Sequence, residues 1–62
     1  MSGHLKYPAQ SRMKDLRFNL DDCDIVGIVE MLATYLPRDA EWDDVEDMDQ
    51  RTFISIVERN EW

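Results

Sequence analysis

The sequence predicts a mainly α-helical protein, in which two to three short helices follow a disordered N-terminal arm and a short extended segment. Two observations support this fold class. Ten of the fourteen residues from Cys23 to Leu36 are apolar, and apolar residues recur at helical spacing between residues 42 and 57. A chain of 62 residues has room for one small domain, which we expect over residues 13–62.

Residues 1–12 contain Gly, Pro and Ser and few large apolar side chains, so we expect a flexible basic arm there. The charge is unevenly distributed. Residues 1–19 carry four basic and one acidic side chain, a balance of +3. Residues 20–62 carry three arginines and thirteen acidic side chains, a balance of −10, which gives −7 in total. This net charge opposes binding of nucleic acid by the whole surface.

An alternating pattern covers residues 14–20. Leu16, Phe18 and Leu20 alternate with Asp15, Arg17 and Asn19. A period of two predicts a short strand with one buried face. Because a lone strand has unpaired backbone groups, this one would have to pair with another chain.

The segment from Cys23 to Leu36 is the clearest helix, and Pro37 marks its end. Its four non-apolar residues share one narrow stripe: Asp24, Gly27, Glu30 and Thr34. The rest of the circumference is apolar and has to be covered. One further short helix can hardly do this, so we expect a homodimer or a stable partner.

The next segment has two apolar faces. Trp42, Val45 and Met48 recur every three residues, and a second group follows at Phe53, Ile54, Ile56 and Val57. These spacings fit either one bent helix over residues 40–59 or two short helices. The β-branched residues between 52 and 57 also leave a strand open.

Acidic residues dominate the segment from Asp39 to Asp49, where seven of eleven side chains are carboxylates. They are Asp39, Glu41, Asp43, Asp44, Glu46, Asp47 and Asp49. On a helix, carboxylates three or four residues apart lie about 5–6 Å from each other, within a factor of two of the phosphate spacing in nucleic acid. The cluster is either a solvated face that keeps an apolar protein soluble or a binding surface for a basic protein, including a nucleic-acid mimic.

Residues for chemistry are scarce. A calcium loop that starts at Asp39 would need a glycine at position 44 and a glutamate at position 50, but these positions hold Asp44 and Gln50, so the motif fails. His4 and Cys23 stand alone and lack the paired spacing of a zinc site. Carboxylates near Cys23 should raise its pKa, which makes it a poor nucleophile. We therefore expect no metal, no cofactor and no enzymatic activity.

The expected location is the cytoplasm. No apolar run approaches the roughly 18 residues that span a bilayer. The single cysteine excludes an internal disulfide and fits a reducing compartment.

The order of an alternating segment, "LRFNLDD", an apolar helix and a second helix resembles the ribbon-helix-helix repressors over residues 14–36. In that family two chains pair their strands, and outward side chains read the major groove. The resemblance implies a DNA-binding regulator that uses Lys14, Arg17 and Asn19. Arg and Asn are able to read guanine and adenine edges.

In size and composition the chain also resembles small acidic accessory proteins from early regions of bacteriophage genomes. That resemblance implies a non-catalytic regulatory protein that binds a host or phage protein in the host cytoplasm. No residue role follows from it. The leading expectation is thus an acidic interaction protein, and the alternative is the ribbon-helix-helix regulator.

Overall fold

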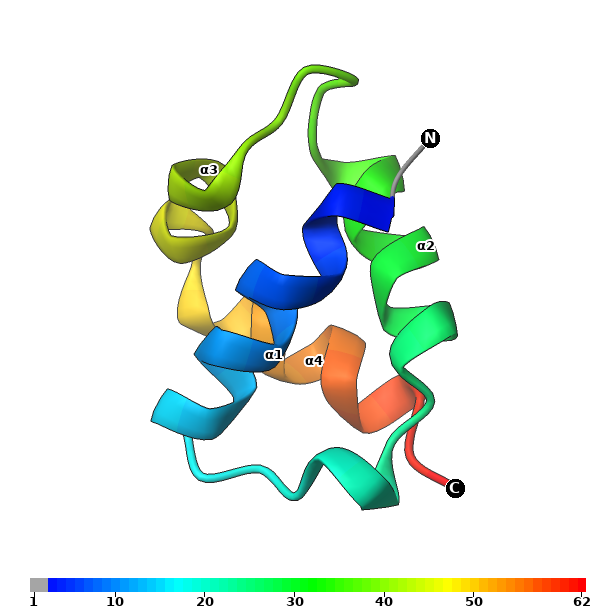
Figure 1. Ribbon diagram of the computed structural model, residues 1–62. Coiled ribbons are helices and arrows are strands. Elements are labelled where there is room, and N and C mark those ends of the chain that lie inside the picture. Colours follow the sequence, from blue (N-terminus) through cyan, green and yellow to red (C-terminus); the bar gives the residue numbers. More distant parts are fainter. Residues whose placement is uncertain (1–2) are drawn as a thin grey trace.

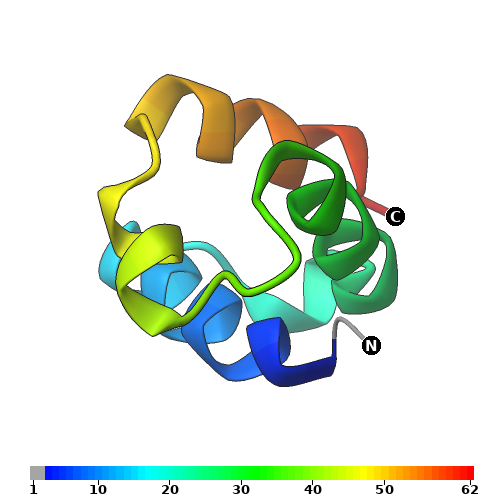
Figure 2. The same cartoon turned by 90° about the horizontal axis from the view of Figure 1, so that it is seen from above.

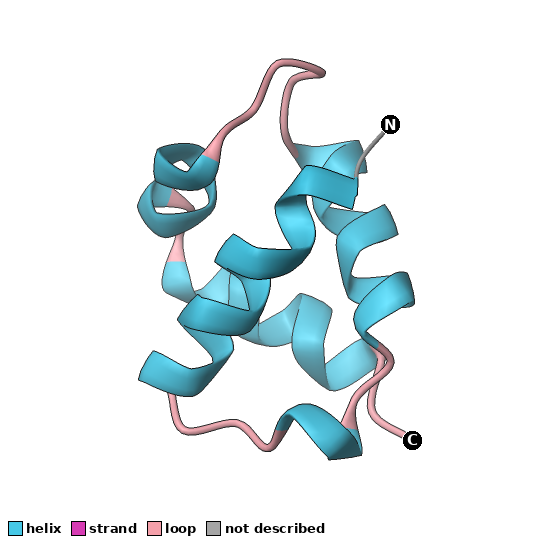
Figure 3. Cartoon of the chain, in the orientation of Figure 1, coloured by secondary structure: helices cyan, strands magenta, loops and turns pink. Residues whose placement is uncertain are grey.

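The computed structural model describes residues 3–62, and its regular elements are helices (Figure 1). In chain order they are the 3-10 helix η1 (Gly3–Leu5), α1 (Lys6–Asp15), the 3-10 helix η2 (Leu20–Asp22), α2 (Ile25–Tyr35), α3 (Trp42–Asp47) and α4 (Gln50–Arg59). Residues 3–62 contain no strand (Figure 3), only an isolated antiparallel bridge between Cys23 and Glu61. The predicted mainly α-helical class is confirmed.

The flexible arm predicted over residues 1–12 is wrong for the part that the structure describes. Residues 6–15 form α1, and its buried side chains are Pro8, Ala9 and Met13. Leu5, at the N-cap position, is buried as well. Pro8 fits because the first turn of a helix has no use for its missing N–H. Residues 1–2 of the predicted arm lie outside the described residues.

The strand predicted over residues 14–20 is also wrong. Helix α1 ends in a left-handed residue, Arg17, with φ of 67°. The amide of Phe18 donates to the carbonyl oxygen of Met13 at 2.9 Å, and the amide of Arg17 donates to that of Lys14 at 3.0 Å. These are the two bonds of a Schellman motif, which closes a helix end. Paired ribbons therefore have no structural basis here.

The alternating pattern was nevertheless informative about burial. Leu16, Phe18 and Leu20 are partly buried against the core. Asp15, Arg17 and Asn19 are exposed, as the pattern predicts. The chain achieves this with a reversal after a helix rather than with a pleated backbone, because the turn also places alternate residues on opposite sides.

Helix α2 is covered mainly from within the chain. It contacts α1, η1 and α4 (Figure 2). Its residues Ile28, Val29 and Leu32 are buried. We expected a homodimer because a single further helix could not cover α2. Helix α1 is a second helix that covers it, so this reason no longer holds. Two large side chains still lie open on α2, because Val26 is 63% exposed and Tyr35 is 59% exposed.

The second half of the domain contains two helices, α3 and α4, which resolves the alternatives left open for residues 40–59. Asp49 occupies the N-cap position of α4 and Asn60 its C-cap position. Phe53, Ile56 and Val57 of α4 are buried in the same core as the side chains of α1 and α2. His4 Nε2 lies 2.6 Å from the carbonyl oxygen of Ala40 and so links η1 to the loop before α3.

Candidate functional site

The predicted acidic surface is present on α3 and the loops beside it. All seven carboxylate residues are exposed: Asp39, Glu41, Asp43, Asp44, Glu46, Asp47 and Asp49. We call these seven residues the acidic surface. Because α3 spans only six residues, the carboxylates are gathered around a single helical turn and a half.

One buried side chain and one charged hydrogen bond hold α3 against the domain. Val45 is fully buried in the core. Arg12 of α1 donates from Nη1 to the carbonyl oxygen of Val45 at 2.6 Å. The same guanidinium lies 4.9 Å from the centre of the Phe53 ring, in cation–π geometry. Arg12 therefore helps to fix α3 in place, and it comes from α1, a helix that the sequence analysis did not predict.

Three of the carboxylates accept local hydrogen bonds. At the start of α3, Asp44 accepts one from the amide of Glu41 at 2.8 Å and the Glu41 side chain accepts one from the amide of Asp44, which together form a capping box. Glu46 accepts one from Trp42 Nε1 at 2.8 Å. These contacts rigidify the helix and leave the other carboxylates to the solvent.

The predicted apolar face of this segment is partly correct. Val45 is buried and Met48 packs against the core. Trp42 does not join them, since its side chain is 46% exposed. The acidic surface therefore includes a half-exposed aromatic ring among its carboxylates.

The residues predicted to read DNA do not form a reading surface. Lys14 lies in the last turn of α1, and Arg17 occupies the left-handed position after it. Asn19 caps η2, because its Oδ1 accepts from the amide of Asp21 at 3.0 Å. The amide group of Asn19 is thus committed to a local turn.

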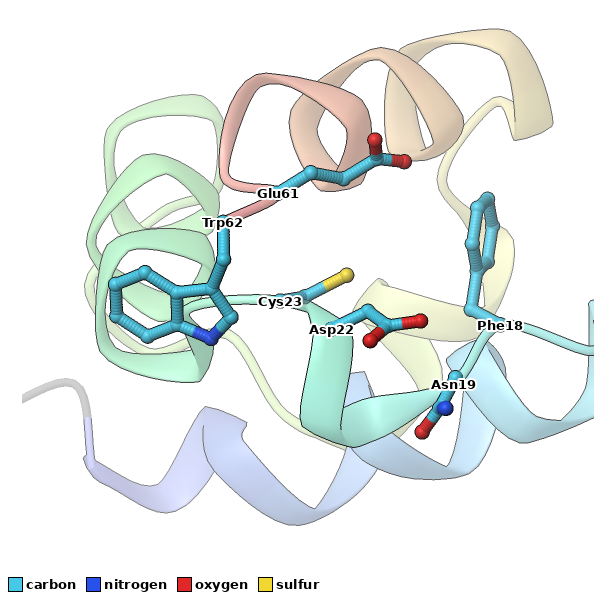
Figure 4. Close-up of a pocket in the computed structure, with 6 residues that line it drawn as sticks. All are labelled: Phe18, Asn19, Asp22, Cys23, Glu61 and Trp62. Atoms are coloured by element: carbon cyan, nitrogen blue, oxygen red, sulfur yellow. The ribbon is translucent and has the colours of Figure 1, made fainter.

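A shallow hollow of about 280 Å³ lies beside Cys23 (Figure 4). Phe18, Asn19, Asp22, Glu61 and Trp62 line it with the cysteine. The backbone closes it, since the amide of Trp62 donates to the carbonyl oxygen of Asp22 at 3.0 Å. The Trp62 side chain does not fold back over the core but stays 83% exposed.

The surroundings of the thiol in this hollow disfavour its thiolate form. Burial raises the pKa of Cys23, and the carboxylates of Glu61 and Asp22 raise it further. A raised pKa lowers the fraction of reactive thiolate at neutral pH. The direction agrees with the sequence-based expectation for Cys23.

Sequence reasoning missed a groove between α2 and α4. It has a volume of about 260 Å³, and its lining includes Tyr35, Arg51 and Arg59. A signal was present, because Arg51, Ser55 and Arg59 are four residues apart and share one face of α4. The groove itself depends on how two helices pack, which a single helical pattern does not reveal.

Within residues 3–62 no group of three or more His, Cys, Asp or Glu side chains is arranged to hold a metal ion. No helix in that range has both the length and the hydropathy to cross a membrane. No protein-family model matches the chain, and neither a curated protein nor a solved structure is significantly similar to it.

Proposed function

We propose that this protein is a small, non-catalytic regulatory protein that binds a partner with a basic surface through its acidic surface. The observation that carries the proposal is the exposure of all seven carboxylates between Asp39 and Asp49 around one short, anchored helix. A partner that ordinarily binds nucleic acid has the matching charge, so the acidic surface would compete with phosphates for it.

The rigidity of α3 supports a role in recognition. Its capping box, the Trp42–Glu46 bond and the Arg12 bond to Val45 fix the helix before a partner arrives. A pre-formed surface loses less conformational entropy on binding than a mobile acidic tail does. Repulsion between Asp43 and Asp47, which are four residues apart, opposes helix formation, so this pair does not serve local helix stability.

The setting that we propose is the cytoplasm, as for the small acidic accessory proteins of bacteriophages that the chain resembles. The ribbon-helix-helix alternative is not carried forward, because residues 14–20 form a helix end and a turn.

The test compares two triple variants with equal charge change. Asp39→Asn/Asp43→Asn/Asp47→Asn removes three carboxylates of the acidic surface that form no hydrogen bond with another described residue. The control, Asp21→Asn/Glu30→Gln/Glu58→Gln, removes three exposed carboxylates elsewhere. Each protein is immobilised and used to capture partners, which are identified by mass spectrometry.

We expect wild type and control to retain the same partner and the Asp39/Asp43/Asp47 variant to lose it. Release of that partner by salt and competition by DNA or RNA would support the mimic. Equal capture by both triple variants would overturn the proposal, as would equal loss.

A further inference from the structure

The groove between α2 and α4 carries positive charge in a strongly acidic protein. Met31 and Ile56 contribute its apolar surface, and Tyr35 stands at its side with more than half of its ring in solvent. Arg51 and Arg59 line the same groove from α4. The two arginines are eight positions apart in the helix, which is about 12 Å along its axis.

The packing of α2 on α4 fixes this groove. Gly27 of α2 lies close to Asn60, the C-cap residue of α4, and a Cβ on Gly27 would overlap Asn60 Oδ1. Asn60 Nδ2 donates to Met31 Sδ at 3.2 Å and to the carbonyl oxygen of Ile56 at 2.8 Å. One end of the helix pair is therefore locked, and the open space lies toward Tyr35 and Arg51.

The two arginines are available to a ligand. Both are exposed, and neither guanidinium group makes a hydrogen bond or ion pair with another residue in the described part of the chain. Arg38 is the only other arginine in residues 20–62. A groove with an apolar base, an aromatic wall and two separated guanidinium groups suits an aromatic side chain with carboxylates on both sides.

The same molecule displays such a segment. Trp42 is 46% exposed, with Asp39 and Glu41 before it and Asp43 and Asp47 after it. Trp42 does not line the groove of its own chain. The helices α3 and α2 lie on opposite sides of the domain (Figures 1 and 2). The match is available only between two copies.

We propose that the α2–α4 groove binds α3 of a second copy of this chain, with Trp42 seated beside Tyr35 and carboxylates of the acidic surface facing Arg51 and Arg59. If the contact is reciprocal, it builds a two-fold dimer with two identical contacts. The inference rests on the acidic surface of the proposed function, which self-association would mask. A basic partner would then compete with the second copy for the same carboxylates.

Salt gives this contact a distinctive signature. Two molecules of charge −7 repel each other at long range, and the Debye length is about 30 Å at 0.01 M salt. At about 0.15 M the length falls to about 8 Å, which screens that repulsion more than the direct contact. At 1 M the contact itself is screened. Association is therefore strongest at intermediate salt.

The test is analytical ultracentrifugation over a concentration series at the three salt levels. We expect the wild type to associate as concentration rises, most strongly near 0.15 M. Arg51→Glu/Arg59→Glu should weaken this association about tenfold or more, because two attractive pairs in each contact become repulsive. Trp42→Ala should weaken it through loss of the aromatic anchor.

A charge-matched control separates the contact from net charge. Lys14→Glu/Arg38→Glu changes the same number of exposed charges outside the groove, and it should associate much as wild type does. A mixing experiment then tests the pairing itself. Asp43→Lys/Asp47→Lys and Arg51→Glu/Arg59→Glu should each fail to self-associate, yet associate when mixed, because both contacts of the mixed dimer are then complementary.

A wild type that stays monomeric at every concentration and salt level would overturn this inference. So would equal loss in the control variant, or a mixture that fails to associate. None of these results would touch the proposed function, because Arg51→Glu/Arg59→Glu leaves the acidic surface intact. That variant should capture the basic partner as wild type does, which separates failure of the one proposal from failure of the other.

Discussion

Helices α1 and α3 pack against each other, yet they serve the domain in opposite ways. Helix α1 is polar in composition but contributes Pro8, Ala9 and Met13 to the core, with Leu5 beside them. Helix α3 contributes a single buried side chain, Val45, and presents its carboxylates outward. Helix α1 completes the hydrophobic core, whereas α3 lies on the surface and exposes its charged side chains.

The difference teaches that polarity alone does not predict a helix's role. The buried residues of α1 are Pro8, Ala9 and Met13, and they continue on one side of the helix with Leu5 before it and the partly buried Leu16 after it, but Pro8 and Ala9 are cyclic or small. Small side chains bury little area each, although they allow close approach to α2. In α3 the large apolar residue Trp42 stays half in solvent. Position on the helix, rather than size, decides which residues are structural.

The largest effect should come from α1. Met13→Ala removes a fully buried side chain and should lower the free energy of unfolding by about 2–5 kcal/mol. That is a large fraction of the total for a domain of this size. Urea denaturation followed by circular dichroism measures it, with the exposed Lys14→Ala as the control. A flexible arm would show no difference between the two variants.

A smaller loss of stability should follow when Val45, the buried residue of α3, is shortened. Val45→Ala removes two buried carbon groups and should lower the free energy of unfolding by about 2 kcal/mol. Amide hydrogen exchange should show faster opening of residues 42–47 than of α1. Uniform acceleration across both helices would mean that α3 is as deeply integrated as α1.

The link between the two helices is Arg12. Arg12→Met keeps the stem but removes the donor to the Val45 carbonyl and the charge over Phe53. We expect a loss of about 1–2 kcal/mol in the free energy of unfolding, because the bond is charge-assisted and partly buried. The matched variant Arg51→Met, on an exposed arginine without such bonds, should be close to neutral.

The end of α1 offers a gain in stability. Arg17 holds a left-handed conformation in which a Cβ is unfavourable, at φ of 67°. Arg17→Gly should raise the free energy of unfolding by about 0.5–1 kcal/mol, after the entropy cost of glycine is included. Thermal melts of Arg17→Gly and of the control Lys14→Gly measure the two effects. The control should be destabilised, because Lys14 lies inside the helix.

The smallest effect belongs to the acidic surface. Asp43 and Asp47 are four residues apart on α3, so their repulsion destabilises the helix by a few tenths of a kcal/mol. Asp43→Asn/Asp47→Asn should recover about that amount, and the recovery should vanish in 1 M salt. A stability loss would instead show that these carboxylates hold the fold.

The sequence predicted the elements that carry strong apolar periodicity. Helix α2 was expected over residues 23–36 and lies at Ile25–Tyr35, and α4 lies at Gln50–Arg59, within the helical stretch expected over residues 40–59. The exposure of the acidic surface was also predicted correctly, since burial of a carboxylate without a basic partner is costly.

The N-terminal third was missed for physical reasons. Two of the three buried residues of α1, Pro8 and Ala9, are cyclic or small, so the residues from Lys6 to Asp15 show no clear apolar stripe. The alternation after it reflects a Schellman turn rather than a strand, because both geometries bury every second residue. The groove beside Tyr35 was beyond reach, since it arises from the contact of Gly27 with Asn60, 33 positions apart in the chain.

The start of α2 depends on residues near the end of α4. The amide of Asp24, just before α2, donates to the carbonyl oxygen of Asn60 at 2.7 Å, and Trp62 bonds to Asp22. During synthesis on the ribosome, the most apolar helix therefore emerges well before its N-terminal support exists. The face of α2 that packs on α4 stays uncovered until α4 has been added, and that interval is when a chaperone would have most apolar surface to bind.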